Sequence, residues 1–142
     1  MNADDNAAVA RRLYEAFNRQ DFDRCLALAR EDIEVVLTPF DQTFHGHAGF
    51  KKFMAIFKTA FPDLTVTVTH QITTADQVVS ECHWRGTHTG PLVSPAGEIP
   101  ATGKTVVKAV FCEVWGLKNG KVANLRNYQD VSSWLRQLGL VP

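Results

Sequence analysis

Four polar side chains alternate along the segment that precedes the last predicted helix. They are an amide, a guanidinium, a phenol and a carboxylate, at Asn124, Arg126, Tyr128 and Asp130. Residues two apart on a β-strand point to the same face, so the four share one face unless a bulge intervenes. If that face lines a closed cavity, Asp130 can act as a general acid/base on carbon while Tyr128 and Arg126 donate to an enolate oxygen. If it faces solvent, the stripe is an ordinary polar surface.

Asp130 has a second interpretation that needs no chemistry. It stands directly before the predicted helix 131–138, where its side chain can cap the helix by accepting from the amide of Ser132 or Ser133. A cap lowers the pKa of a carboxylate, whereas a general base needs a pKa near the working pH. Arg126 can likewise pair with an acid and be purely structural. Both interpretations stay open at this point.

The histidines offer weaker candidates. His88 lies in GTHTG at the end of a predicted strand, where an imidazole could shuttle protons or donate to an oxyanion, or could simply be satisfied by Thr87 and Thr89. His45 and His47 flank a glycine and could chelate a metal together, but no third ligand is indicated. We therefore expect no metal site. No Gly-rich nucleotide-binding loop is present either, so we expect no cofactor.

The periodicity of apolar residues predicts the elements that must hold these side chains. Val9, Leu13 and Phe17 have helical spacing, Asp21 can cap a second short helix, and a third helix begins near Phe50 and ends at Pro62. Period-two alternation and the Asn-Gly turn signal at 119–120 predict the strands, which are 33–37, 64–73, 77–87, 104–117 and 121–129. The stretch 89–103 is predicted to be a long loop.

Helices followed by consecutive hairpin strands indicate an α+β fold. We expect one domain over residues 1–142, with a single curved antiparallel sheet packed on three helices. This cone-shaped α+β barrel would leave an internal pocket where sheet and helices cannot close fully. The side chains expected to bind a substrate there are Phe53, Phe57, Trp84, Phe111, Trp115 and Asn124.

The composition limits the classes of partner and the cellular compartments that we expect for this protein. The 142 residues carry 15 basic and 15 acidic side chains and no basic run, which argues against nucleic acid or an anionic membrane as a partner. No apolar stretch is long enough to span a bilayer, and the N-terminal residues show no signal-peptide pattern. Three cysteines, an odd number without a CxxC pair, are typical of free thiols in a reducing compartment, so a cytoplasmic location is expected.

Several segments resemble the SnoaL-like polyketide cyclase family, which belongs to the same superfamily as ketosteroid isomerase, scytalone dehydratase and limonene epoxide hydrolase. They are HGHAGFKKF, WRGTHTGPL, IPATGKTV, WGLKNGKV and YQDVSSWLRQLGL, within residues 8–140. The resemblance implies that the aspartate of the final D-x-x-x-x-L-x-Q-L-G segment, here Asp130, is the general acid/base. It also implies an intramolecular aldol cyclisation that uses neither metal nor cofactor. The neighbouring strand 104–117 contains no histidine to assist this aspartate.

Three functions follow as hypotheses. The first is cofactor-free acid/base chemistry on a hydrophobic carbonyl compound, the second is hydrolysis by water that Asp130 activates, and the third is binding of an apolar ligand without catalysis. A homodimer is expected as well, because the long strand pair 104–117 and 121–129 and the Thr-rich face of 64–74 need cover. The loop residues Leu92, Val93 and Ile99 would otherwise be exposed. The resemblance implies the same, since members of the superfamily commonly dimerise through the sheet.

Overall fold

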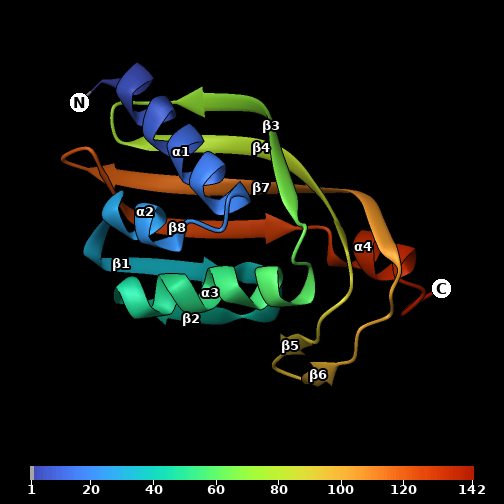
Figure 1. Ribbon diagram of the computed structural model, residues 1–142. Coiled ribbons are helices and arrows are strands. Elements are labelled where there is room, and N and C mark those ends of the chain that lie inside the picture. Colours follow the sequence, from blue (N-terminus) through green and yellow to red (C-terminus); the bar gives the residue numbers. More distant parts are fainter. Residues whose placement is uncertain (1) are drawn as a thin grey trace.

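Six strands form one curved sheet, and helices cover one of its faces (Figure 1). The computed structural model describes residues 2–142. The strand order is β2-β1-β8-β7-β4-β3, and β5 and β6 form a separate small hairpin. In chain order the elements are α1 (Ala3–Asn18), α2 (Phe22–Ala27), β1 (Ala29–Leu37), the 3₁₀ turn η1 (Thr38–Phe40), β2 (Gln42–His45), α3 (Gly46–Ala60), β3 (Thr65–Thr73), β4 (Gln77–Thr87), β5 (Leu92–Ser94), β6 (Gly97–Ile99), β7 (Thr105–Lys118), β8 (Lys121–Gln129) and α4 (Val131–Gln137).

This architecture confirms the predicted α+β fold, with one difference in the sheet. β1 and β8 pair in parallel, whereas the other neighbouring strands in the sheet pair antiparallel, so the sheet is mixed and not wholly antiparallel. As predicted, three helices (α1, α2 and α3) lie against one face, while α4 follows the end of β8 (Figure 1). The parallel pair joins the first and last strands of the chain, which are the second and third strands in the sheet order.

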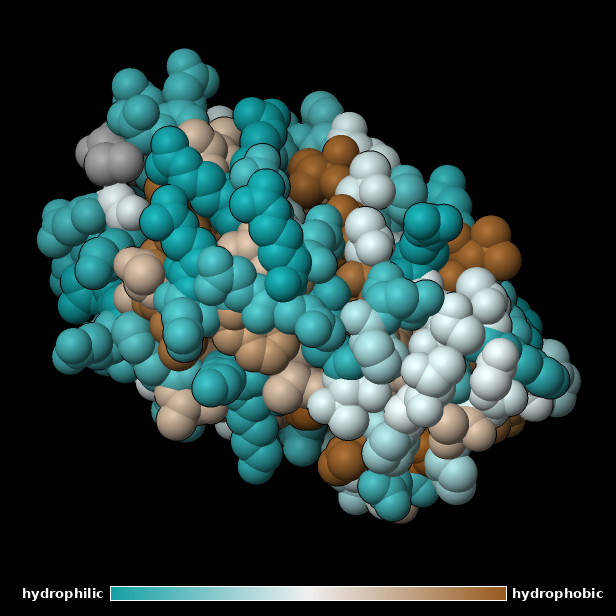
Figure 2. Space-filling model, viewed as in Figure 1, coloured by the Kyte–Doolittle hydropathy of each residue, from teal (hydrophilic) through white to brown (hydrophobic). Residues whose placement is uncertain are grey.

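The helices form where the apolar period predicts them. α3 buries Phe50, Phe53, Met54 and Phe57, which recur at the three- and four-residue spacing of one helix face. The outer surfaces of these helices are polar, and Figure 2 shows the helix-covered side of the molecule as mostly hydrophilic, with small scattered apolar areas. The cap predicted at Asp21 is present, because its carboxylate accepts from the backbone N–H of Arg24 at 3.1 Å.

The four strands β3, β4, β7 and β8 follow their predicted bounds closely, whereas β1 begins four residues earlier than predicted and β2 was not predicted. α3 begins at Gly46, within the short loop predicted before this helix. A register shift between Val68 and His70 interrupts the alternation of β3, and Ile72 beyond it is 56% exposed instead of facing the core. The segment predicted as a loop contains the hairpin of β5 and β6, and Leu92 in it is 1% exposed. The Asn-Gly turn between β7 and β8 has positive φ at both residues, 53° and 78°, as a type I′ turn requires.

Candidate active site

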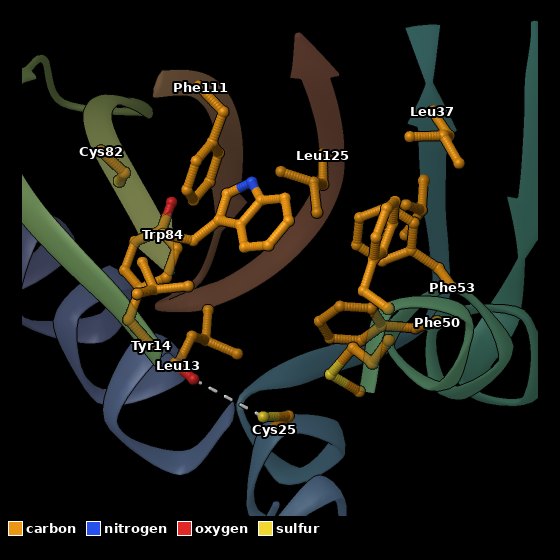
Figure 3. Packing of buried hydrophobic residues seen from close by; sticks show 14 of the residues in the cluster. Leu13, Tyr14, Cys25, Leu37, Phe50, Phe53, Cys82, Trp84, Phe111 and Leu125 are labelled. Carbon is orange, nitrogen blue, oxygen red and sulfur yellow. Dashed lines mark hydrogen bonds between the residues drawn. The ribbon is translucent and has the colours of Figure 1, made fainter. Parts of the chain in front are cut away.

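A cavity lies between the concave face of the sheet and the three helices that cover it. The cavity has a volume of about 70 Å³, which is enough for several water molecules. Figure 3 shows buried side chains from α1, α2 and α3 and from β1, β4, β7 and β8 packed around this interior. The walls are formed by Leu13, Tyr14, Phe17, Cys25, Phe50, Phe53, Met54, Phe57, Leu64, Val66, Trp84, Phe111, Glu113, Trp115, Leu125, Asn127 and Gln129.

Five aromatic residues predicted to line the pocket do line it. Phe53 and Phe57 come from α3, Trp84 from β4, and Phe111 and Trp115 from β7. Phe53 and Phe57 meet edge to face, with ring centroids 5.8 Å apart. The walls are therefore largely aromatic, and such a surface favours a flat apolar ligand.

Glu113 of β7 is the one charged side chain among these lining residues, and it is 5% exposed. Its oxygen Oε1 accepts from the hydroxyl of Tyr14 at 2.9 Å, and Oε2 accepts from Nδ2 of Asn127 at 2.8 Å. Burial raises the pKa of Glu113 to about 7, although both hydrogen bonds act to lower it. The carboxyl group thus titrates close to neutrality.

Tyr14 links Glu113 to a second side chain of β7. Its hydroxyl accepts from Nε1 of Trp115 at 2.9 Å while it donates to Glu113, and the two rings lie edge to face. Burial, and next the negative charge of Glu113, raise the pKa of Tyr14 well above its usual range. The phenol therefore stays neutral and keeps its proton available for the carboxylate.

A second set of donors reaches Glu113 from β8 and α4. Nε2 of Gln129 donates to Oδ1 of Asn127 at 2.7 Å, and Nε1 of Trp134 donates to Oε1 of Gln129 at 2.9 Å. Each amide nitrogen carries two hydrogens, and these bonds use one of each. Asn127 and Gln129 line the cavity, and each keeps a second amide hydrogen that none of these bonds uses.

This arrangement suits proton transfer. A carboxyl that titrates near neutrality in an apolar cavity can accept a proton from a weak carbon acid and return it. Within residues 2–142, no group of three or more His, Cys, Asp or Glu side chains is placed to hold a metal ion.

The predicted stripe on the last strand faces the other way. The cavity is lined by the intervening residues Leu125, Asn127 and Gln129, so the expectation that Asn124, Arg126 and Tyr128 point inward is wrong. Tyr128 is 42% exposed on the outer face of the sheet, and Arg126 and Asn124, which lie on that strand at the same parity, are absent from the walls. Asn124 instead packs against Gly116, where an added Cβ would lie 2.5 Å from its amide oxygen.

Asp130 is an exposed helix cap. Its carboxylate accepts from the hydroxyl of Ser132 at 2.9 Å and from the backbone N–H of Ser133 at 3.1 Å, which lower its pKa in that order. It is not among the lining residues. Of the two interpretations of Asp130 that the sequence left open, the structure supports the helix cap.

His88 also lies outside the cavity walls, fully buried beside Phe61. Its Nδ1 accepts from the backbone N–H of Thr102 at 3.2 Å and lies 3.0 Å from the Thr102 hydroxyl, so its partner is Thr102 and not the adjacent threonines. Burial lowers the pKa of His88, which keeps the ring neutral. Its contacts join the ends of the segment that carries the β5–β6 hairpin, a structural arrangement.

Sequence reasoning missed Glu113, Tyr14, Asn127 and Gln129, although the strand pattern contained a signal for the first. Phe111, Glu113 and Trp115 alternate on one face of the predicted strand, so a carboxylate was placed between two aromatic residues that were expected in the pocket. An acid at that parity cannot face solvent without turning its aromatic neighbours outward as well.

The model of the SnoaL-like polyketide cyclase family matches residues 7–138 of the chain. A search of curated proteins finds no match. In the region that the structure describes, no helix is both long and apolar enough to cross a membrane.

Solved structures of the same fold agree with this family match. A protein of Jannaschia sp. CCS1 named as a SnoaL-like polyketide cyclase superposes with a TM-score of 0.86 at 21% identity, over 99% of this chain and 95% of its own. AclR of Streptomyces galilaeus, named as a hydroxylase, gives 0.81 at 24% identity, over 96% and 86%. TerC, co-crystallised with polyporic acid, gives 0.74 at 20% identity, over 95% and 98%. With its fold, its cavity and a family match along nearly its whole length, the chain belongs to the SnoaL-like polyketide cyclase family.

Proposed function

We propose that this protein binds an uncharged, hydrophobic carbonyl compound and catalyses cofactor-free proton transfer on it, with Glu113 as the general acid/base. The observation that carries the proposal is the position of Glu113, a buried carboxyl group in the wall of a largely apolar cavity. The role that the sequence suggested for Asp130 passes to Glu113, because Asp130 is an exposed cap outside the cavity.

The proposed reaction begins with the carboxylate form of Glu113. It takes a proton from the carbon next to a carbonyl, so that the C–H bond breaks and an O–H bond forms on Glu113. The electron pair moves to the carbonyl oxygen. We assign the stabilisation of the resulting enolate to the second amide hydrogens of Asn127 and Gln129, which their hydrogen bonds to Glu113 and Asn127 leave unused. In an aldol cyclisation the enolate carbon then attacks a second carbonyl of the same molecule. The alkoxide so formed takes the proton back from Glu113.

The chemistry of the walls supports the substrate class. The lining residues include no lysine, arginine or histidine, so a carboxylate or phosphate ligand would meet Glu113 without a compensating cation. A neutral ligand meets aromatic rings and a few hydrogen-bonding groups. Membership of the polyketide cyclase family and the co-crystallised ligand of TerC are consistent with a small-molecule ligand.

The test is exchange of the α-protons of phenylacetone in D₂O, followed by proton NMR. The wild-type protein is expected to accelerate exchange, and Glu113→Gln is expected to reduce the acceleration by about 10²- to 10⁴-fold, the contribution of a positioned general base. Asp130→Asn serves as the matched acid-to-amide control outside the cavity. Equal exchange by wild type and Glu113→Gln would refute the assignment.

One observation favours binding without catalysis as a second function. Both oxygens of Glu113 already accept hydrogen bonds from the protein, so the carboxyl can be a purely structural group. The same experiment separates the two functions when ligand binding is measured beside it by thermal stabilisation. A stabilised protein that leaves the α-protons unexchanged is a binding protein.

A homodimer remains part of the proposal, through the long strand pair of the sheet rather than through the loop residues. Leu92 is buried within its own chain and needs no partner. On the outer face of the sheet, however, Val110 of β7 is 58% exposed and Tyr128 of β8 is 42% exposed on adjacent strands. This uncovered apolar surface supports pairing of two copies through their sheets.

A further inference from the structure

Glu113 lies at the meeting point of two hydrogen-bonded chains that each end in a tryptophan. One runs from Trp115 through Tyr14, and the other runs from Trp134 through Gln129 and Asn127. An indole N–H can only donate. Through the two amides, Trp134 therefore fixes the direction of every hydrogen bond between itself and the carboxyl group. On the other side, Tyr14 donates because a carboxylate can only accept.

The longer chain shows how this direction is imposed. Side-chain amides can normally be reversed, since their oxygen and nitrogen ends have the same shape. Trp134 removes that freedom, because its N–H requires the oxygen of Gln129 to face it at 2.9 Å. The nitrogen of Gln129 then faces the oxygen of Asn127, and the nitrogen of Asn127 is left to face Glu113.

We propose that Trp134 is a positioning residue for Glu113. Trp134 acts through the amides of Gln129 and Asn127 and holds an N–H donor on the carboxylate. The chain of contacts gives α4 a role in the cavity that it does not itself line. Trp134 is 1% exposed and Asn127 is 4% exposed, and Gln129 between them is half-buried, so both ends of the amide chain are shielded from water. Asp130 caps the N-terminal end of α4, the helix that carries Trp134.

This fixed direction also determines where a proton on Glu113 must lie. Asn127 presents its nitrogen to the carboxyl group, and its oxygen accepts from Gln129, so the amide chain offers no acceptor to a proton on Glu113. A proton taken up by Glu113 cannot pass into that chain and stays at the cavity wall, where Glu113 and Tyr14 lie. The statement about the proton rests on the proposed function, whereas the positioning of the carboxylate by Trp134 does not.

The titratable groups near Glu113 do not change their charge in the pH range in which Glu113 titrates. Tyr14 faces it from α1, Cys82 faces it from β4, and Cys112 is its neighbour on β7. Burial raises the pKa of all three above their usual values, so they stay neutral through the range in which Glu113 titrates. The donors from Tyr14 and Asn127 are thus the groups that stabilise its charged form.

The test is the titration of the Glu113 carboxyl, followed by carbon NMR on protein labelled at the glutamate Cδ. The Glu113 resonance is identified by its absence from Glu113→Gln. Trp134→Phe keeps an aromatic ring and removes the N–H, together with part of the buried volume of the indole. We expect it to raise the pKa of Glu113 by about half a pH unit or more, because the carboxylate loses a fixed donor.

A double-mutant comparison shows whether the effect passes through the amides. In an Asn127→Leu background, Trp134→Phe should produce no additional change in the pKa of Glu113, because the path is already cut. Gln129→Met, which also breaks the chain, replaces Trp134→Phe if the latter does not fold. An unchanged Glu113 pKa in Trp134→Phe, or an equal change in both backgrounds, would overturn the proposal. If the pKa moves as expected while Glu113→Gln still exchanges α-protons at the wild-type rate, the positioning stands and the proposed function fails.

Discussion

The hydroxyl of Tyr14 donates a 2.9 Å hydrogen bond to Glu113, which lies 99 residues later in the chain. The bond ties the first helix to the long strand β7 and places a neutral donor on the most deeply buried acid of the cavity. Fold and candidate site are therefore coupled, because α1 must dock on the sheet before the carboxylate has its partner. Removing either side chain should affect stability and proton transfer together.

The raised pKa of Glu113 predicts a distinctive pH dependence of stability. The unfolded chain loses this proton near pH 4.5 and the folded chain near pH 7, so the stabilising contribution is full below pH 4.5 and is lost as the pH rises through 7. At 1.36 kcal/mol for each unit of pKa difference, the loss is on the order of 3 kcal/mol. Urea unfolding of wild type and Glu113→Gln between pH 4 and pH 8 measures it, since the difference between the two isolates this group. A constant difference across that range would contradict the burial argument.

Tyr14→Phe should weaken both the structure and the carboxylate. The substitution leaves the N–H of Trp115 without its acceptor and removes one donor from Glu113, at a cost of about 1–3 kcal/mol in unfolding free energy. The pKa of Glu113 should rise further, because its charged form loses a hydrogen bond. Tyr128→Phe, the same change at an exposed tyrosine, is the control and should leave both quantities unchanged. A Glu113 titration that is the same in Tyr14→Phe and wild type would show that the phenol does not stabilise the carboxylate.

Asp130 should behave as a cap. Asp130→Asn retains an acceptor for the N–H of Ser133 and should leave the melting temperature nearly unchanged, whereas Asp130→Ala should lower it by a few degrees. Differential scanning calorimetry of the two variants gives the comparison. Neither change should abolish proton exchange, and an Asp130→Asn protein that is stable but inactive would return the catalytic role to this residue.

The outer face of the sheet should mediate dimerisation. Sedimentation equilibrium at micromolar concentration is expected to give a mass of twice 15.8 kDa for the wild type. Val110→Lys should shift it toward the monomer, because a charge would be buried between the two sheets. Val93→Lys, at an equally exposed valine on the β5–β6 hairpin, should leave the dimer intact. A wild-type protein that sediments only as a monomer would exclude this assembly.

The sequence predicted those parts of the fold that depend on local pattern. The apolar period of α3, the alternation of β7 and the Asn-Gly turn after it each have a short-range physical cause, and all three are found where expected. The parallel pairing of β1 with β8 has no such local cause, because it joins segments from opposite ends of the chain. The register shift in β3, beyond which Ile72 is exposed, leaves no sign in the sequence, because the alternation of 64–73 continues through Ile72.

The candidate site was predicted only in its apolar part. Periodicity identified the aromatic walls, since a large side chain on a buried face has few other places to go. On β8 the parity was misassigned, because polar residues stand on both faces of that strand: Arg126 faces outward while Asn127 faces the cavity. Which polar face is buried depends on the partners that Glu113 and Trp134 supply from other elements, and a single strand does not contain that information.

The most direct test of the central claim is the pH profile of α-proton exchange, compared with the titration of the Glu113 carboxyl in the same protein. A general base works only in its deprotonated form, so the second-order exchange rate at low ketone concentration should rise with pH and level off above the pKa of its free form. We predict one ionisation near pH 7 in both measurements, shared by wild type and Asp130→Asn and missing from Glu113→Gln. An exchange rate that is flat between pH 5 and pH 8, or that follows an ionisation other than the one measured for Glu113, would contradict the account.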